Sequence, residues 1–450
     1  MGKKQFIYHK TMKRSLKTMS MGTILSAFGL FCPLVAQTSD SISMNLDKVL
    51  EVALSDNPDI QVANRTIEIK KYAKKETITG LFPTVDFTLA GIKGVIIPEA
   101  NLGGMKIKMG SEKSFTWTGT ATLPLVVPQL WESLKISQSS VELALEEARS
   151  SKISTLATVK KAFYQLLYAR DSYDVLLQSY ALADENLTQA RNKFGYDIVP
   201  EYDTLTAYVQ KVSLEPTMLS MKNTLALAEM QLKVLMGVDV NEPIRFEGHL
   251  SDYEEKLFND LLILKEDNGI DNNSSLIQID IQKRQLILSE RLNKLGYIPT
   301  VALQFSINRA YSGFLGYANT ANLTLALNWT IFDGGSKYMK TRQNKLSIEN
   351  LEQTQEYIKQ QLEMSVSASL NSIETAAEQV VSNKSSVYAS ERTYEISSKR
   401  YEVGMGTQLE LNSSATSLQQ TRLQYVQSIF DFVTAQAALE ETLGKVITDK

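Results

Sequence analysis

Apolar residues recur every seven positions along two long stretches of the chain. In the first stretch this column is Val159, Leu166, Tyr173, Tyr180, Leu187 and Phe194, and in the second it is Val366, Ile373, Val380, Val387, Tyr394 and Tyr401. Mostly small residues follow three positions later, which lets neighbouring helices approach closely. The pattern predicts long helices over residues 129–194 and 335–401 in extended coiled-coil packing. Long helices in an ordinary bundle are the alternative.

The two stretches belong to an internal repeat. Residues 57–91 resemble residues 272–307, and the sequence KFGYDIVPEYD (193–203) matches RYEVGMGTQLE (400–410), with equivalent residues 207 positions apart, as in Lys193 and Arg400. We therefore predict a tandem duplication, with repeat one at about 45–240 and repeat two at about 270–445.

The shorter helical segments fit the lengths of the long ones. Each long helix would span about 100 Å at ~1.5 Å per residue. Segments 57–80 and 198–237 together match the first long helix, and segments 273–297 and 405–443 match the second. This predicts that two shorter helices, stacked end to end, pair with each long helix.

Four other segments alternate between apolar and polar residues: 84–94, 114–125, 300–309 and 320–331. Their apolar faces include the residues that we expect to face lipid: Phe115, Trp117, Leu123, Leu323, Leu325, Leu327 and Trp329. Such segments are typical of transmembrane β-barrels, and Trp117 and Trp329 suit a bilayer interface. A soluble sandwich with one wet face explains each strand equally well when strands are taken singly.

Four strands are too few to form a barrel. A four-stranded interior has no room for side chains, and open sheet edges do not occur in lipid. A membrane location therefore requires oligomerisation, and three copies would supply 12 strands. The predicted fold class is an α+β membrane protein: a trimeric 12-stranded barrel, four strands per protomer, continued by an α-helical coiled-coil barrel.

The N-terminus has the pattern of a secretory signal. Basic residues up to Lys17 precede an apolar run from Ile24 to Val35, which is too short to span a bilayer as a helix. We predict a signal peptide over residues 1–36 and a mature protomer over 37–450. The start at Met1 or Met12 stays open, as does lipidation at Cys32, where Phe31 occupies a position that normally needs a small residue.

Composition excludes several kinds of chemistry. One cysteine and two histidines leave little for metal, thiol or imidazole catalysis. The nucleotide-binding glycine motifs are absent, so no cofactor is expected. Residues 1–36 carry six basic and no acidic residues, so their removal changes the net charge from −3 to −9. That sign argues against a nucleic-acid partner.

Several motifs, in this order, resemble those of the outer-membrane efflux channel family, the TolC type. They are LDKVLEVALSDNPDI (46–60), the two proline turns FPTV (82–85) and IPTV (298–301), IFDGG (331–335) and RYEVGMGTQLEL (400–411). The resemblance implies a homotrimer in the cell outer membrane with a periplasmic helical extension. It also implies a periplasmic adaptor and an inner-membrane pump of the RND or ABC type as partners. In the first repeat Asp197 replaces the turn glycine, but aspartate tolerates left-handed backbone.

The predicted function is a passive exit duct for drugs, small molecules or proteins in a tripartite efflux or type I export system. The alternative is a periplasmic coiled-coil adaptor or scaffold without a pore, which accounts for the helices but not for the four apolar-faced strands. We predict that the protein is not an enzyme, because no convincing catalytic set can be assembled from the residues present.

The two turns between long helices and return helices are the candidate functional residues. Phe194, Asp197, Tyr401, Gly404 and Gly406 are expected on the rim that faces the adaptor. Asp203 and Glu410 are expected at a constriction, where a trimer would hold six carboxylates that favour cations. The alternative is that both are solvated carboxylates at helix N-termini. The resemblance implies an acidic gate residue at Glu410, although the next acidic position of that pattern is Ser413.

Overall fold

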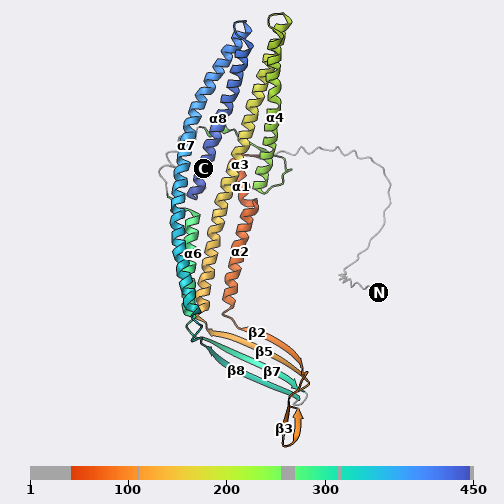
Figure 1. The fold of residues 1–450 in the computed structure, drawn as a ribbon, viewed down its shortest axis with the longest axis vertical. Helices are drawn as coiled ribbons and strands as arrows, with labels where there is room; N and C mark the ends of the chain where they lie inside the picture. The colour runs from red at the N-terminus through yellow and green to blue at the C-terminus, as the bar shows by residue number, and fades with distance from the viewer. Residues whose placement is uncertain (1–41, 109–110, 255–268, 313–315, 446–450) are drawn as a thin grey trace, which may run out of the picture. The chain divides into compact units, whose positions relative to one another are not determined.

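The computed structural model describes residues 42–108, 111–254, 269–312 and 316–445 (Figure 1). The predicted signal peptide, with Cys32 and the two candidate start residues, lies outside these residues. Among the helices described, none has both the length and the apolar composition that crossing a bilayer requires.

Two long helices form the frame of the molecule. α3 covers Pro128–Gly195 and α7 covers Ser336–Glu402. The N-terminal part of each apolar column is buried, as at Val159 and Leu166 in α3 and at Ile373 and Val380 in α7. α3 begins with a proline in its first turn, whereas α7 follows two glycines with left-handed backbone, Gly334 and Gly335. The heptad pattern therefore marks real packing faces.

Five shorter α-helices also lie within the described residues. They are α1 (Leu46–Asp56), α2 (Pro58–Thr79), α4 (Glu201–Met236), α6 (Ser274–Leu295) and α8 (Gln408–Leu443). α3 contacts α2 and α4, and α7 contacts α6 and α8, while α3 also contacts α6 and α8. These contacts confirm that two shorter helices pair with each long one. α4 and α8 begin three residues later than predicted, because residues 198–200 and 405–407 belong to the turns.

A buried asparagine joins the shorter helices of each repeat. Asn57 caps α2, its side-chain oxygen accepting from the backbone N–H of Asp59, and its amide donates to the Leu235 carbonyl near the end of α4 at 2.7 Å. Asn273 caps α6 and donates to the Thr442 carbonyl of α8 at 2.8 Å. The same joint is therefore built twice.

In each joint, a glycine with left-handed backbone ends the helix whose carbonyl accepts from the asparagine. Gly237 ends α4 with a φ of 77°, and Gly444 ends α8 with a φ of 67°. A Cβ atom on Gly237 would lie 2.3 Å from the Asp56 carbonyl oxygen, so no larger residue fits without movement. The largest buried apolar cluster surrounds this region and draws on α1, α3, α7 and α8.

The four long strands form one antiparallel sheet in the order β2–β5–β7–β8 (Figure 1). Their bounds are Thr84–Lys93, Lys113–Val126, Thr300–Ser312 and Gly316–Asn328. Smaller strands are β1 (Ile42–Met44), paired with β6 (Ile244–Phe246), and the hairpin β3 (Glu99–Leu102) and β4 (Met105–Lys108). Because β7 continues to Ser312, the connection to β8 is shorter than predicted.

The strand register aligns the apolar positions of the whole sheet. Ala121 lies opposite Phe305, and Phe305 lies opposite Leu323. On the outer strands this face is open, with Phe87 70% and Leu325 67% exposed. The predicted faces are therefore continuous across four strands that lie in one sheet, not in the two packed sheets of a sandwich.

Two details of the strands differ from the prediction. Trp329 lies beyond the end of β8, since Asn328 already pairs with Thr300, the first residue of β7. The Trp329 ring N–H donates to the Tyr297 carbonyl at 3.1 Å. The register also shifts between Pro124 and Val126, so Leu125 does not continue the face of Leu123.

Candidate functional site

The turn between α3 and α4 depends on an aspartate in left-handed backbone. Asp197 has a φ of 56° and is the one non-glycine residue with positive φ among the residues described. Its N–H donates to the Phe194 carbonyl at 2.9 Å, and the N–H of Ile198 donates to the Lys193 carbonyl at 2.9 Å. The expectation that aspartate would hold this turn is confirmed.

The turn between α7 and α8 uses its two glycines differently. Gly404 has a φ of 79° and open space around a Cβ position. Gly406 has ordinary backbone, but a Cβ there would lie 3.1 Å from the Tyr401 nitrogen. Thr407 then caps α8, its hydroxyl accepting from the Glu410 N–H at 3.2 Å. Gly404 therefore allows the left-handed backbone of the turn, and Gly406 allows the chain to pass close to the backbone of Tyr401.

Tyr401 links the two turns and lies at the end of its heptad column, as predicted. It is only 2% exposed, because it ends the buried heptad column, so its ring is not part of a rim surface. The Lys193 ammonium lies 4.2 Å from the ring centroid and donates to the Tyr401 carbonyl. Burial, with a smaller contribution from the Asp203 charge, raises the pKa of Tyr401 to about 12. The hydroxyl therefore stays neutral at physiological pH.

Large apolar side chains surround the two turns and are open to solvent. We call them the tip surface: Phe194, Tyr196, Ile198, Tyr202, Leu205, Val403, Met405 and Leu409. Tyr196 is 80% and Met405 77% exposed. Exposed apolar patches of this kind mark interaction sites. The sequence analysis identified only Phe194 in this group, although the unusual apolar content of both turns was a usable signal.

The two candidate gate carboxylates lie in first helical turns. Asp203 belongs to the first turn of α4 and Glu410 to the first turn of α8. Such positions stabilise negative charge through the helix dipole. Glu410 lies 3.8 Å from the Arg400 guanidinium of its own hairpin, and Asp203 lies near Tyr401. A role in a pore remains a prediction for both.

Aromatic residues flank the apolar face of the sheet. Trp117 lies opposite Arg309, which lies opposite Asn319, so Trp117 is near the hairpin end of the sheet. The Tyr311 and Tyr317 rings, 5.0 Å apart, lie at the same end. At the other end Trp329 binds the Tyr297 carbonyl. The sequence analysis missed these tyrosines, because only strand register assigns them to the two ends.

The spacing of the two tryptophans can be compared with a bilayer. Trp329 is ten residues beyond Asn319, the residue at the level of Trp117. Ten residues of antiparallel strand span about 34 Å. A strand tilt near 40° reduces this to ~26 Å, close to the ~25 Å apolar band of outer-membrane barrels.

A sequence model described as outer membrane efflux protein matches residues 49–238 and 278–445. The chain belongs to the outer membrane efflux protein family. The two matched segments coincide with the two repeats, and the match places the chain among outer-membrane channels, not among enzymes. The resemblance that the motifs indicated is thereby confirmed.

One curated relative is the outer membrane efflux protein BepC of Brucella suis, 23% identical over 156 residues. That alignment covers 34% of each protein, so the chain spans about a third of the length of this relative. Similar solved structures include VceC of Vibrio cholerae, with a TM-score of 0.71 at 12% identity over 89% of this chain and 96% of that one. The open state of MtrE of Neisseria gonorrhoeae has a TM-score of 0.70 at 15% identity over 89% of each chain. At these identities the structures show a shared fold.

Proposed function

We propose that this chain is the outer-membrane channel subunit of a tripartite efflux or type I export system. It would act as a passive exit duct for drugs, small molecules or proteins. The observation that carries the proposal is the sheet: one register aligns the apolar residues of four strands on one face, with aromatic residues at both ends. Contact of this apolar face with lipid tails is favourable, whereas its exposure to water costs free energy.

The two outer edges of this sheet support the proposed homotrimer. β2 and β8 are the outer strands, and each has a ladder partner on one side in the described sheet. An unpaired strand edge is unfavourable in lipid, because its backbone N–H and C=O groups have no partner. Three copies joined edge to edge would form a closed barrel of 12 strands. The helices would continue into the periplasm as a tube.

The tip surface is the proposed docking site for a periplasmic adaptor. It combines exposed apolar residues from both turns, such as Ile198 and Met405, with backbone that is fixed by Asp197 and Gly404. A fixed apolar surface binds a partner with little loss of conformational entropy. The adaptor would connect the channel to an inner-membrane pump of the RND or ABC type, which supplies the energy.

Fractionation and conductance test this proposal together. We expect the protein in the outer-membrane fraction as a trimer that survives on an unboiled gel, and ion-conducting pores when it is added to planar bilayers. A soluble periplasmic monomer without conductance would favour the alternative, an adaptor or scaffold protein. Co-purification of an adaptor and a pump from the same membranes would identify the pump class.

A further inference from the structure

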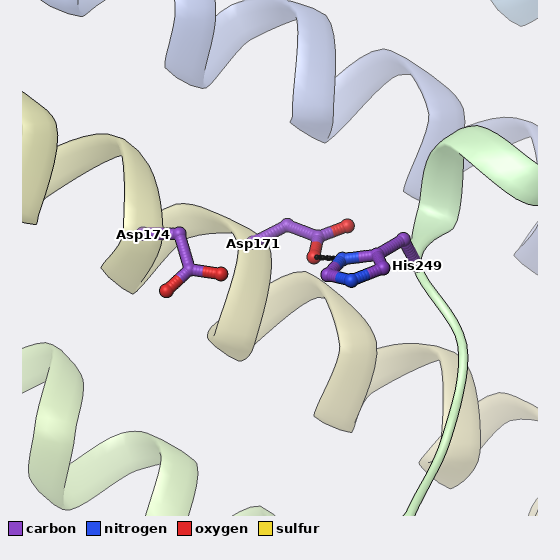
Figure 2. A group of neighbouring side chains, drawn as sticks. All are labelled: Asp171, Asp174 and His249. Atoms are coloured by element: carbon purple, nitrogen blue, oxygen red, sulfur yellow. Dashed lines mark hydrogen bonds and ion pairs between the residues drawn. The ribbon is translucent and has the colours of Figure 1, made fainter.

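Three side chains that commonly bind metals lie together where the connection after β6 reaches α3 (Figure 2). Asp171 and Asp174 lie one helical turn apart on α3, and His249 precedes the short 3-10 helix η1 (Leu250–Tyr253). The His249 Nδ1 atom lies 2.8 Å from Asp171 Oδ1. One donor atom from each residue fits within a mutual distance of 4.8 Å. The donors thus come from two separate elements of the fold.

The backbone around His249 is held firmly against α3. The Asp171 Oδ2 atom accepts from the Leu250 N–H at 2.8 Å, and the Arg170 guanidinium donates to the Gly248 carbonyl at 3.1 Å. Asp252 caps the other side, accepting from the His249 N–H at 2.8 Å. These contacts fix the backbone on both sides of His249 before any ligand arrives, which lowers the entropy cost of binding.

The cluster holds two carboxylates, and the charges of His249 and of the neighbouring Arg170 act on Asp174. Within the described residues Asp174 makes no hydrogen bond and no ion pair. Burial, together with the charge of Asp171, raises the pKa of Asp174. The nearby Arg422 guanidinium is bound to Gln178 and to Glu391, with distances of 3.0 and 2.6 Å. A second carboxylate beside Asp171 therefore has no cation bound to it in this part of the chain.

We propose that Asp171, Asp174 and His249 bind one divalent first-row transition-metal ion, with Zn²⁺ as the representative. One imidazole nitrogen and two carboxylate oxygens suit an ion of borderline softness, and water would complete the coordination. Ligand atoms around tetrahedral Zn²⁺ are about 3.3 Å apart, given metal–ligand distances near 2.0–2.1 Å. The 2.8 Å contact between His249 and Asp171 needs to widen by only about 0.5 Å.

The surroundings give a metal ion access and room. The three residues line a groove of about 400 Å³ that Gln178 and Ser251 also line. Because Asp174 is held by no hydrogen bond in the described residues, its carboxylate can rotate toward the ion without breaking one. A bound ion would join α3 to the connection between the two repeats.

Zn²⁺ binding to the full chain tests the proposal. The protein is purified in detergent without a polyhistidine tag, treated with EDTA, and titrated with Zn²⁺ by calorimetry, with metal content measured after dialysis. Asp174→Asn and His249→Gln remove one donor each, and Asp184→Asn is the matched control, because Asp184 is on the same helix and pairs with Lys211. Since even outer-shell partners of metal ligands are worth 10–100-fold in affinity, each donor variant should weaken binding by at least about tenfold.

We expect one Zn²⁺ per chain, unchanged affinity in Asp184→Asn, and visible absorption bands of bound Co²⁺ that disappear on addition of Zn²⁺. Circular dichroism and the trimer band check that Asp174→Asn is folded. No saturable binding, or equal affinity in Asp174→Asn and the wild type, would show that Asp171 and His249 form an ion pair only. Displacement by equimolar Mg²⁺ would also overturn the proposal, since a site with an imidazole donor should discriminate against a hard cation.

Discussion

Asp197 and Gly404 hold the same left-handed backbone conformation at matching positions of the two hairpin turns. Their φ values are 56° and 79°. Each also makes the same backbone hydrogen bond. The Asp197 N–H donates to the Phe194 carbonyl, and the Gly404 N–H donates to the Tyr401 carbonyl, in the last turn of the preceding long helix. Aspartate is among the few residues that visit this region at modest cost. The two copies therefore share the turn geometry, although glycine stands at this position in only one of them.

This equivalence gives a matched pair of substitutions at Gly404. We expect Gly404→Trp to abolish efflux and leave trimer assembly intact, because a bulky residue strains the turn by about 1–2 kcal/mol and alters the tip surface. Gly404→Asp should retain efflux, since Asp197 already occupies the same conformation. Drug susceptibility and the trimer band on an unboiled gel measure both effects. Wild-type efflux in Gly404→Trp would mean that docking occurs elsewhere.

The raised pKa of Tyr401 predicts that the stability of the protein depends on pH in the alkaline range. This pKa is raised from the usual 10 to about 12 in the folded protein, so the unfolded state loses this proton at lower pH than the folded state does. Stability from this group is thus fully present below pH 10 and is lost as the pH rises toward 12. We expect the thermal unfolding midpoint to fall less between pH 9 and pH 11.5 in Tyr401→Phe than in the wild type.

The matched control is Tyr196→Phe, because Tyr196 is exposed on the tip surface. It should show the same pH dependence as the wild type. Tyr401→Phe should also keep wild-type stability at pH 7, since the hydroxyl has no hydrogen-bond partner among the described residues and its loss leaves none unpaired. A large loss at pH 7 would show that the hydroxyl is bonded in the assembled protein.

The long helices and the strands could be predicted from the sequence, because a buried helix or strand face requires apolar residues at regular intervals. The heptad columns identified the faces of α3 and α7 at Val159 and Ile373, and alternation identified the apolar face of the sheet. The end of a strand depends on its partner, and for that reason Trp329 was wrongly assigned to β8. Contacts between distant residues leave no periodic signal.

The joints of the short helices and the metal-ligand cluster show this limit. Asn57 bonds to Leu235, 178 residues away, and His249 meets Asp171, 78 residues away. Each residue alone looks ordinary in the sequence, and the scarcity of histidine argued against any metal site. Only the fold brings the donors together. The contact of Lys193 with the Tyr401 ring is likewise a contact between distant residues.

Leu325 tests the lipid-facing surface. Leu325→Arg should cost about 2–4 kcal/mol if the residue lies at the middle of the bilayer, and should reduce trimer yield in the outer membrane. The control is Thr324→Arg, on the neighbouring position that faces the other side of the sheet. We expect the control to assemble normally. Equal yields of the two variants would contradict the assignment of lipid and lumen faces.

Asp203 and Glu410 are expected to form a cation-selective constriction. In a trimer they would supply six carboxylates near one level, and such a ring favours cations. Both are also first-turn residues of helices, so their charges have a structural explanation as well. The double variant Asp203→Asn with Glu410→Gln should lower cation preference in planar bilayers and relieve block by multivalent cations. Glu201→Gln is the control for the Asp203 substitution, because it removes one carboxylate from the same first turn of α4. If reversal potentials in the double variant equal those of the control, the two carboxylates stabilise helix ends and have no role in the pore.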